Sequence, residues 1–196
     1  KINKLIMKRL FYFVAVLFAV SVVTSSCATA KKATAPTGLV EQTLPLSEAR
    51  HRTDAEYYRA VQSGKSTDMS MAKKVAIQNA RQELAASINA DLESVVENYA
   101  ANRQLPSDEK STFETRMTEL TYTIVQQRLS GSTLSDEKLF TTPTGEYQYF
   151  VCMQLNKADM KEALLNELQK NEKLISDFEI SEFRKLYEKK LSEYQQ

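Results

Sequence analysis

The most regular pattern of apolar and polar positions lies in the middle of the chain. Apolar residues recur there every three or four positions, and most positions between them are charged or polar. The stripe consists of Ala72, Ala76, Ala80, Leu84, Ile88, Leu92, Val96 and Tyr99. This period places the stripe on one face of a long α-helix, for which Thr67 or Asp68 is a suitable N-cap. Such a helix needs a surface to pack on, because helix propensity alone is marginal in water.

Two segments carry the pattern of β-strands. Residues 56–66 combine aromatic and β-branched residues with Gly64, which predicts a first strand. Alternation over 146–155 places one set of side chains on a common face, namely Tyr147, Tyr149, Val151, Met153 and Leu155. A turn at 141–145 joins this strand to a less regular one over 129–140. The two are expected to form an antiparallel hairpin.

A second helix is expected after a break at 105–109, with Ser107 as its cap and an end near Gln127. Its apolar stripe is Phe113, Met117, Leu120 and Ile124. The threonines in this segment suit a strand equally, so we expect a conversion from helix to strand over 125–129.

A C-terminal helical region is expected to open at Asn156 or Asp159 and to restart at Ser181. Its first stripe is Met160, Leu164, Leu168, Ile175 and Phe178, and its second is Phe183, Leu186, Tyr187 and Tyr194. The second stripe is a candidate interaction surface, because apolar faces with dense flanking charge suit a coiled coil or a helix-in-groove contact. The alternative is that it packs on its own domain.

Together these elements predict an α+β fold, in which a small antiparallel sheet packs on the long helix and a C-terminal helical extension follows. We expect the α+β domain to span 45–156, with a short helical turn within 47–52 at its start. The helical extension then spans 157–196.

The chain begins with the pattern of an export signal. Lys8 and Arg9 precede an apolar run over 10–23, and small residues follow. The apolar core is shorter than the ~20 residues that a membrane-spanning helix needs. We therefore expect 1–26 to be a signal peptide, whose true start is Met7 if residues 1–6 lie upstream of it.

Cys27 follows Thr24-Ser25-Ser26, and small residues directly before such a cysteine resemble the lipobox of bacterial lipoproteins. In those proteins the cysteine thiol is lipidated and becomes the mature N-terminus. Residues 27–44 would then be a lipidated cysteine and a flexible tether. Thr24 stands where lipoboxes usually carry leucine, so ordinary secretory cleavage and retention as an anchor helix are the alternatives.

Charge argues against a nucleic-acid partner. The chain has 26 basic and 25 acidic residues, and the leader holds four of the basic residues and none of the acidic ones. The rest of the chain is therefore slightly acidic and offers no broad basic field.

Candidate catalytic and metal-binding residues are scarce. His51 is the single histidine, and the two cysteines are Cys27 and Cys152. The sequence contains no HExxH or paired-cysteine pattern, and its four glycines are too scattered for a phosphate-binding loop. We expect no catalytic residue, metal or cofactor, and hence no enzyme. His51 is expected at the surface, and Cys152 as a buried, unpaired thiol, with a disulfide between chains as the alternative.

A family resemblance rests on residues 58–64, Asp68 and the alanine-rich helix that includes Asn79-Ala80-Arg81 and Glu83-Leu84-Ala85. With the later hairpin around 145–149, this order resembles the lipoprotein-20 family of small outer-membrane lipoproteins of Gram-negative bacteria. The resemblance covers 56–156 and the lipobox. It implies a dodecin-like α+β domain and no established reaction, and only Cys27 carries over as a functional residue.

The expected function is that of a non-enzymatic structural or protein-interaction component of the bacterial envelope. The protein would be lipid-anchored in the outer membrane, face the periplasm, and associate with itself or with an envelope protein. The alternative is a periplasmic module that binds a small ligand, with Tyr57, Tyr58, Tyr147 and Tyr149 of the predicted sheet as its pocket wall. The favoured interpretation of these tyrosines is that they are half-buried packing residues on a sheet with one face in water.

Overall fold

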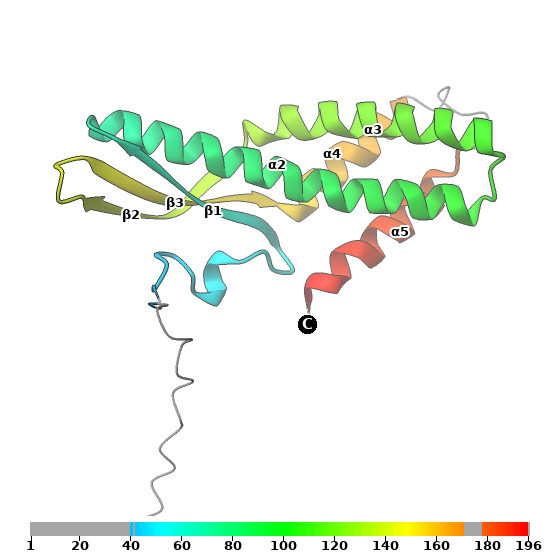
Figure 1. Cartoon of the computed structure of the whole chain (residues 1–196). Coiled ribbons are helices and arrows are strands. Elements are labelled where there is room, and N and C mark those ends of the chain that lie inside the picture. The colour runs from blue at the N-terminus through cyan, green and yellow to red at the C-terminus, as the bar shows by residue number, and fades with distance from the viewer. Residues whose placement is uncertain (1–39, 41, 171–177, 196) are drawn as a thin grey trace, which may run out of the picture. The chain divides into compact units, whose positions relative to one another are not determined.

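A three-stranded antiparallel sheet lies against a long helix in the computed structural model (Figure 1). The elements follow the order η1 (Ala49–His51), β1 (Tyr57–Ser66), α2 (Met69–Asn102), α3 (Ser107–Leu129), β2 (Thr133–Thr141), β3 (Tyr147–Asn156), α4 (Lys157–Lys170), α5 (Ile180–Ser192) and η3 (Glu193–Gln195). The predicted α+β class, with a small sheet on a long helix, is confirmed.

The structure describes residues 40, 42–170 and 178–195. The predicted signal peptide, Cys27 and most of the predicted tether therefore lie outside the described residues, as does Ile175. All the elements belong to one unit that spans Thr43–Gln196.

The strand order is β1-β3-β2, and the central strand β3 runs antiparallel to both neighbours. Tyr58 lies opposite Leu155, and Gly64 lies opposite Tyr149. The predicted hairpin is confirmed as β2 and β3, with a bulge in β2 between Leu134 and Asp136. Alternation directs one face of the sheet toward α2.

All eight residues of the predicted apolar stripe of α2 are buried, which confirms the long amphipathic helix. Asp68 caps it, because its carboxylate accepts a hydrogen bond from the backbone N–H of Met71 at 2.8 Å. At 1.5 Å per residue, these 34 residues extend about 51 Å. The first part of α2 lies over the sheet, whereas its end extends past the sheet and packs against α3 and α5 (Figure 1).

Helix α3 differs from the sequence-based expectation at both ends. It starts at Ser107, so Ser107 is its first helical residue and the predicted serine cap is wrong; Pro106 occupies the N-cap. The expected conversion to strand over 125–129 is also wrong, because the helix continues to Leu129. The hydroxyls of Thr115, Thr121 and Thr123 donate to backbone carbonyls three or four residues earlier, which satisfies these side chains within the helix.

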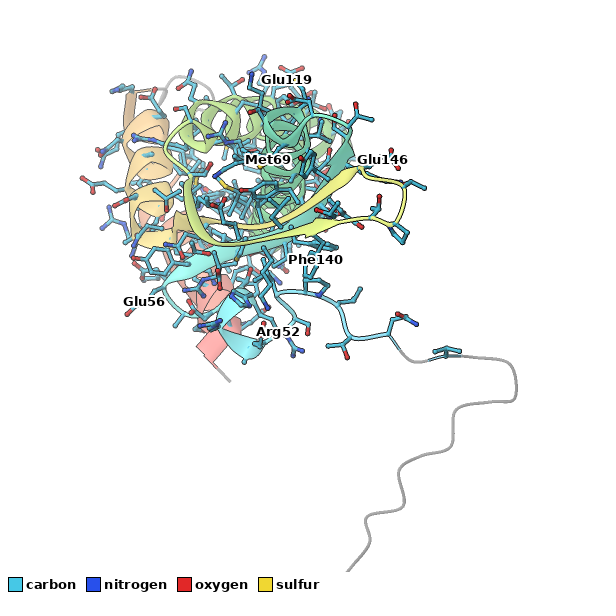
Figure 2. The ribbon with its side chains drawn as sticks, turned by 90° about the vertical axis from the view of Figure 1, so that its left-hand side faces the viewer. Arg52, Glu56, Met69, Glu119, Phe140 and Glu146 are labelled. Atoms are coloured by element: carbon cyan, nitrogen blue, oxygen red, sulfur yellow. The ribbon has the colours of Figure 1, made fainter. Side chains whose placement is uncertain are left out.

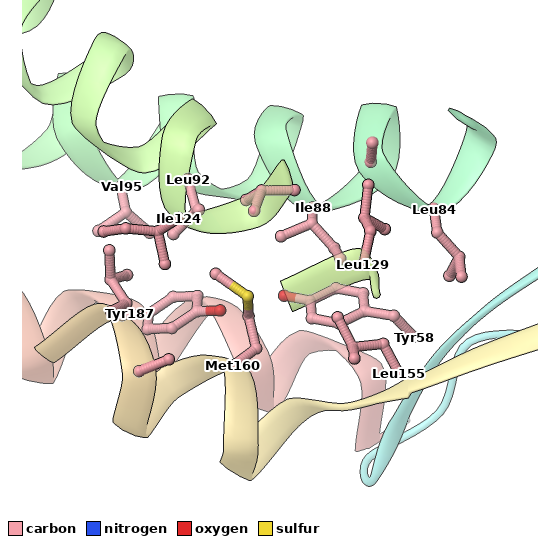
Figure 3. Packing of buried hydrophobic residues seen from close by; sticks show 14 of the residues in the cluster. Tyr58, Leu84, Ile88, Leu92, Val95, Ile124, Leu129, Leu155, Met160 and Tyr187 are labelled. Carbon is pink, nitrogen blue, oxygen red and sulfur yellow. The ribbon is translucent and has the colours of Figure 1, made fainter. Parts of the chain in front are cut away.

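The C-terminal helices share one core with the sheet and α2. Figure 3 shows Leu84, Ile88 and Leu92 of α2 facing Met160 of α4 and Tyr187 of α5. Asn156 opens α4, since its side-chain oxygen accepts hydrogen bonds from the backbone N–H groups of Ala158 and Asp159. Further along α2, aromatic rings fill the core, with the ring centroid of Tyr99 5.4 Å from Phe113 and 5.2 Å from Phe178.

Residues 43–52, called the strap here, lie on the face of the sheet opposite α2. Figure 2 shows Arg52 of the strap on one side of the sheet and Glu119 of α3 on the other. Leu46 is buried and lines a small hollow with Val61 and Phe150. The predicted helical turn in this segment is confirmed as η1.

The contact between β1 and α2 depends on Gly64. A Cβ atom at this position would lie 2.4 Å from both the carbonyl oxygen of Ala72 and the backbone nitrogen of Ala76. Helix and strand therefore approach closely here because the strand carries no side chain and the helix carries alanines.

We predict that Gly64→Ala lowers the free energy of unfolding by about 1–3 kcal/mol, because the added methyl group must push the helix backbone away. Urea denaturation followed by circular dichroism measures this. Gly131→Ala is the matched control, since its Cβ would meet only the carbonyl oxygen of Arg128, at 3.4 Å. Equal stability of the two variants would contradict the prediction.

Candidate functional site

A buried carboxylate in the second half of α2 is the centre of a polar group that joins several elements. Asp91 is 5% exposed. It accepts hydrogen bonds from the hydroxyl of Tyr58 at 3.2 Å and from that of Tyr194 at 2.9 and 3.0 Å. The ammonium group of Lys190 lies 3.8 Å away. One side chain of α2 thus joins the first strand to the C-terminal end of the chain.

Lys157, the first residue of α4, lies beside this carboxylate and is 2% exposed. Its Nζ lies 3.5 Å from the ring centroid of Tyr194 and 4.8 Å from that of Tyr58, which are cation–π contacts. No described residue forms a hydrogen bond with this Nζ. Burial lowers the pKa of Lys157 to about 8. The negative charges of Asp91 and Asp54 act in the opposite direction and raise it by less.

The tyrosines of this group stay protonated at neutral pH. Burial raises the pKa of Tyr58 well above its usual range, and Tyr187 and Asp91 act in the same direction. Burial also raises the pKa of Tyr187 to about 12 and raises that of Tyr194. The hydroxyls of Tyr58 and Tyr187 point toward one another across Met160 (Figure 3). We call Tyr58, Asp91, Lys157, Tyr187 and Tyr194 the Asp91 cluster.

The Asp91 cluster fastens the last helix to the body of the domain. Two of its hydroxyls bond to Asp91, and its members come from β1, α2, α4, α5 and η3. A buried ionised group is tolerated only where such partners surround it. Sequence reasoning missed Asp91 as a site residue. The available signal was its position three residues after Ile88 and four before Val95, within the apolar stripe.

The structure places the four candidate interaction residues of the C-terminal stripe on or in the core of their own domain. Phe183 and Tyr187 are fully buried, and Leu186 packs at the margin of the core. Tyr194 bonds to Asp91. Of the two interpretations of this stripe, packing on its own domain is the one observed for these residues.

His51 is buried, so the expectation that it lies at the surface is wrong. The strap places its ring on the sheet, where Nε2 lies 2.9 Å from Oδ2 of Asp136 in β2. Glu48 Oε2 lies 2.9 Å from Nδ1. The hydrogen bond with His51 lowers the pKa of Asp136. His51 therefore holds the strap against the sheet.

Cys152 is buried and unpaired, as predicted. Its Sγ lies 3.8 Å from the carbonyl oxygen of His51, and burial raises the pKa of its thiol. A thiol in this state is a weak nucleophile.

The four tyrosines proposed as a pocket wall are distributed between the two faces of the sheet. Tyr58 is buried beneath α2, and Tyr149 lies on the same face with the ammonium group of Lys73 5.5 Å from its ring centroid. Tyr57 lies on the opposite face, 5.1 Å from the guanidinium group of Arg59. The structure does not bring these tyrosines together as one wall.

An open groove of about 910 Å³ lies between the first two-thirds of α2 and the C-terminal end of α3. It is lined by Lys74, Ile77, Gln78, Arg81, Gln82, Ala85, Ala86, Asn89, Tyr122, Gln126, Leu129 and Ser130. The floor is apolar, whereas the margins carry amides and two cations. Sequence reasoning missed this groove because it depends on the packing of two helices.

Neither a metal centre nor a membrane-spanning helix is found in the part of the chain that the structure describes. There, His, Cys, Asp and Glu do not gather in groups of three or more that could hold an ion. Among the same residues, each helix is too short or too polar to cross a bilayer.

Comparison with models of protein families, with curated proteins and with solved structures gave no match to this chain. The fold class of the protein is therefore assigned from its structure alone. The protein is an α+β domain in which a buried aspartate, lysine and tyrosine cluster fastens a C-terminal helix.

We predict that Tyr194→Phe lowers the free energy of unfolding by about 1.5–3 kcal/mol, because it removes a hydroxyl that donates to a carboxylate. Denaturant unfolding measures this, and Tyr122→Phe, at an exposed position of α3, is the control. In an Asp91→Asn background the cost of Tyr194→Phe should fall. An unchanged cost there would show that the hydroxyl acts on something other than Asp91.

Lys157 should make stability depend on pH between its folded-state pKa, about 8, and the ordinary lysine value of 10.5. In this window the unfolded chain holds a proton that the folded chain has released, so stability rises with pH. Relative to Lys157→Met, the wild-type protein should gain on the order of 2–3 kcal/mol between pH 7 and 10. Lys185→Met, at an exposed position of α5, keeps Lys157 and should follow the wild-type profile. Parallel profiles for all three proteins would refute the assignment.

Proposed function

We propose that this protein is an exported lipoprotein held on the outer membrane by acyl chains on Cys27. Its domain faces the periplasm and acts as a structural or protein-interaction component of the envelope, not as an enzyme. The observation that carries the proposal is the order of basic residues, short apolar run and small residues that ends at Cys27.

The physical chemistry of anchoring supports a stable attachment. Each buried acyl CH₂ contributes about 0.8 kcal/mol, so that a single chain binds a membrane only marginally. The several acyl chains of a bacterial lipoprotein bind it durably. The small and polar residues of the predicted tether give the domain freedom to move below the membrane surface.

The interaction role is favoured over the alternative of a small-ligand module built on the sheet. Tyr58 and Tyr149 face α2, and the strap covers part of the opposite face. The long pair of helices α2 and α3 instead presents an open groove. The slightly acidic charge of the chain beyond its leader favours a protein or glycan partner over nucleic acid.

We predict that Cys27→Ala abolishes metabolic labelling with palmitate and moves the protein from the membrane to the soluble fraction. Cell fractionation after labelling measures both. Cys152→Ala is the matched control, because it removes the other cysteine, which is buried, and should keep the label and the membrane location. A Cys27→Ala protein that stays with the membrane would refute the anchor.

A further inference from the structure

The groove between α2 and α3 carries unpaired positive charge. Lys74 and Arg81 lie on its margin, and its lining contains no acidic residue among those the structure describes. Among the described residues, no ion pair involves Lys74 or Arg81, whereas the neighbouring Lys73 pairs with Glu137. Arg81 donates through Nε to the hydroxyl of Ser132 at 3.2 Å, which fixes the stem and leaves the end of its guanidinium group for another partner.

The same groove is rich in side-chain amides. Gln78, Gln82 and Asn89 of α2 line it together with Gln126 of α3. An amide offers both a donor and an acceptor, so this lining suits a ligand whose surface mixes hydroxyl and amide groups. From Lys74 to Asn89 the lining extends about 22 Å along α2, at 1.5 Å per residue. That length fits a chain-like ligand better than a compact one.

The floor of the groove argues against a protein segment as the occupant. Protein interfaces depend on large apolar or aromatic anchors that enter pockets. Here Ala85 and Leu129 are already buried, and Tyr122 is the large apolar side chain that stands exposed, at 55%. A single exposed ring beside small residues suits the flat C–H face of a sugar, which packs on an aromatic surface.

We propose that the α2–α3 groove binds an acidic glycan chain whose sugars carry acetamido groups. Lys74 and Arg81 pair with carboxylates of the glycan, the amides pair with its hydroxyl and acetamido groups, and Tyr122 stacks on a sugar ring. The choice of this glycan rests on the proposed envelope location, whereas binding itself depends only on the groove and not on Cys27.

The test uses the full chain purified in detergent and titrated with three probes. Glycan strands cut from cell-wall sacculi by an amidase carry acetamido sugars and free carboxylates. Chitooligosaccharides carry the acetamido sugars without the carboxylates, and polyglutamate carries carboxylates without sugar. We expect these amidase-cut glycan strands, called the trimmed strands here, to bind most tightly. Their affinity should fall as the salt concentration is raised.

Two double variants separate the groove from general surface charge. Lys74→Gln with Arg81→Gln should weaken binding of the trimmed strands by roughly tenfold or more, as expected for lost charge-assisted hydrogen bonds. Arg184→Gln with Lys185→Gln removes the same charge from exposed positions of α5 and should leave binding unchanged. Tyr122→Ala should weaken binding of both sugar probes.

The proposal fails if the trimmed strands do not bind, if chitooligosaccharides bind equally well, or if the α5 variant loses as much affinity as the groove variant. Tighter binding of polyglutamate would assign the groove to an acidic protein segment instead. Because these measurements use purified protein, they are independent of the labelling of Cys27. Failure of the glycan site is thus distinguishable from failure of the membrane anchor.

Discussion

The fold depends on the need to bury one face of α2 along its whole length. A helix of 34 residues is far longer than the three-stranded sheet can cover. β1 approaches the start of the helix where Gly64 meets Ala72 and Ala76, and it reaches Asp91 through Tyr58. Beyond Asp91 the stripe is covered by helices and carries Leu92, Val95 and Tyr99, whereas the positions beside Gly64 are alanines. Small side chains bring the strand close, and large ones fill the wider space between helices.

The polar cluster lies where these two environments meet. At that junction α4 and α5 join the sheet and α2, and Asp91 bonds to residues from both sides. A buried carboxylate is costly without partners, so the arrangement is stable only when β1, α2 and the last helix occupy their places together. Such a cluster links the C-terminal segment to the core in one register, whereas apolar contacts alone tolerate small shifts.

The surfaces available for function are those that this packing leaves open. The C-terminal stripe and the inner face of the sheet are used within the domain, and the strap covers part of the outer face. The flank of α2 beside the end of α3 stays open because α3 ends at Leu129 while α2 continues alongside the sheet. This open helical groove is the surface that the packing leaves accessible to a ligand.

Local periodicity was enough to predict several elements of the fold. The stripe of α2, the alternation in β3 and the α+β class follow from the spacing of apolar residues, because each spacing has one matching backbone geometry. The sequence left the cap of α2 open between Thr67 and Asp68, and the structure shows Asp68. Which residues pack against one another could not be predicted in this way. The burial of Phe183 and Tyr187, the burial of His51 between the strap and the sheet, and the proximity of Asp91 and Lys157 depend on contacts between residues far apart in the chain. A local pattern shows that a face is apolar or that a charge interrupts it, but only the packed structure shows what covers that face and what neutralises that charge.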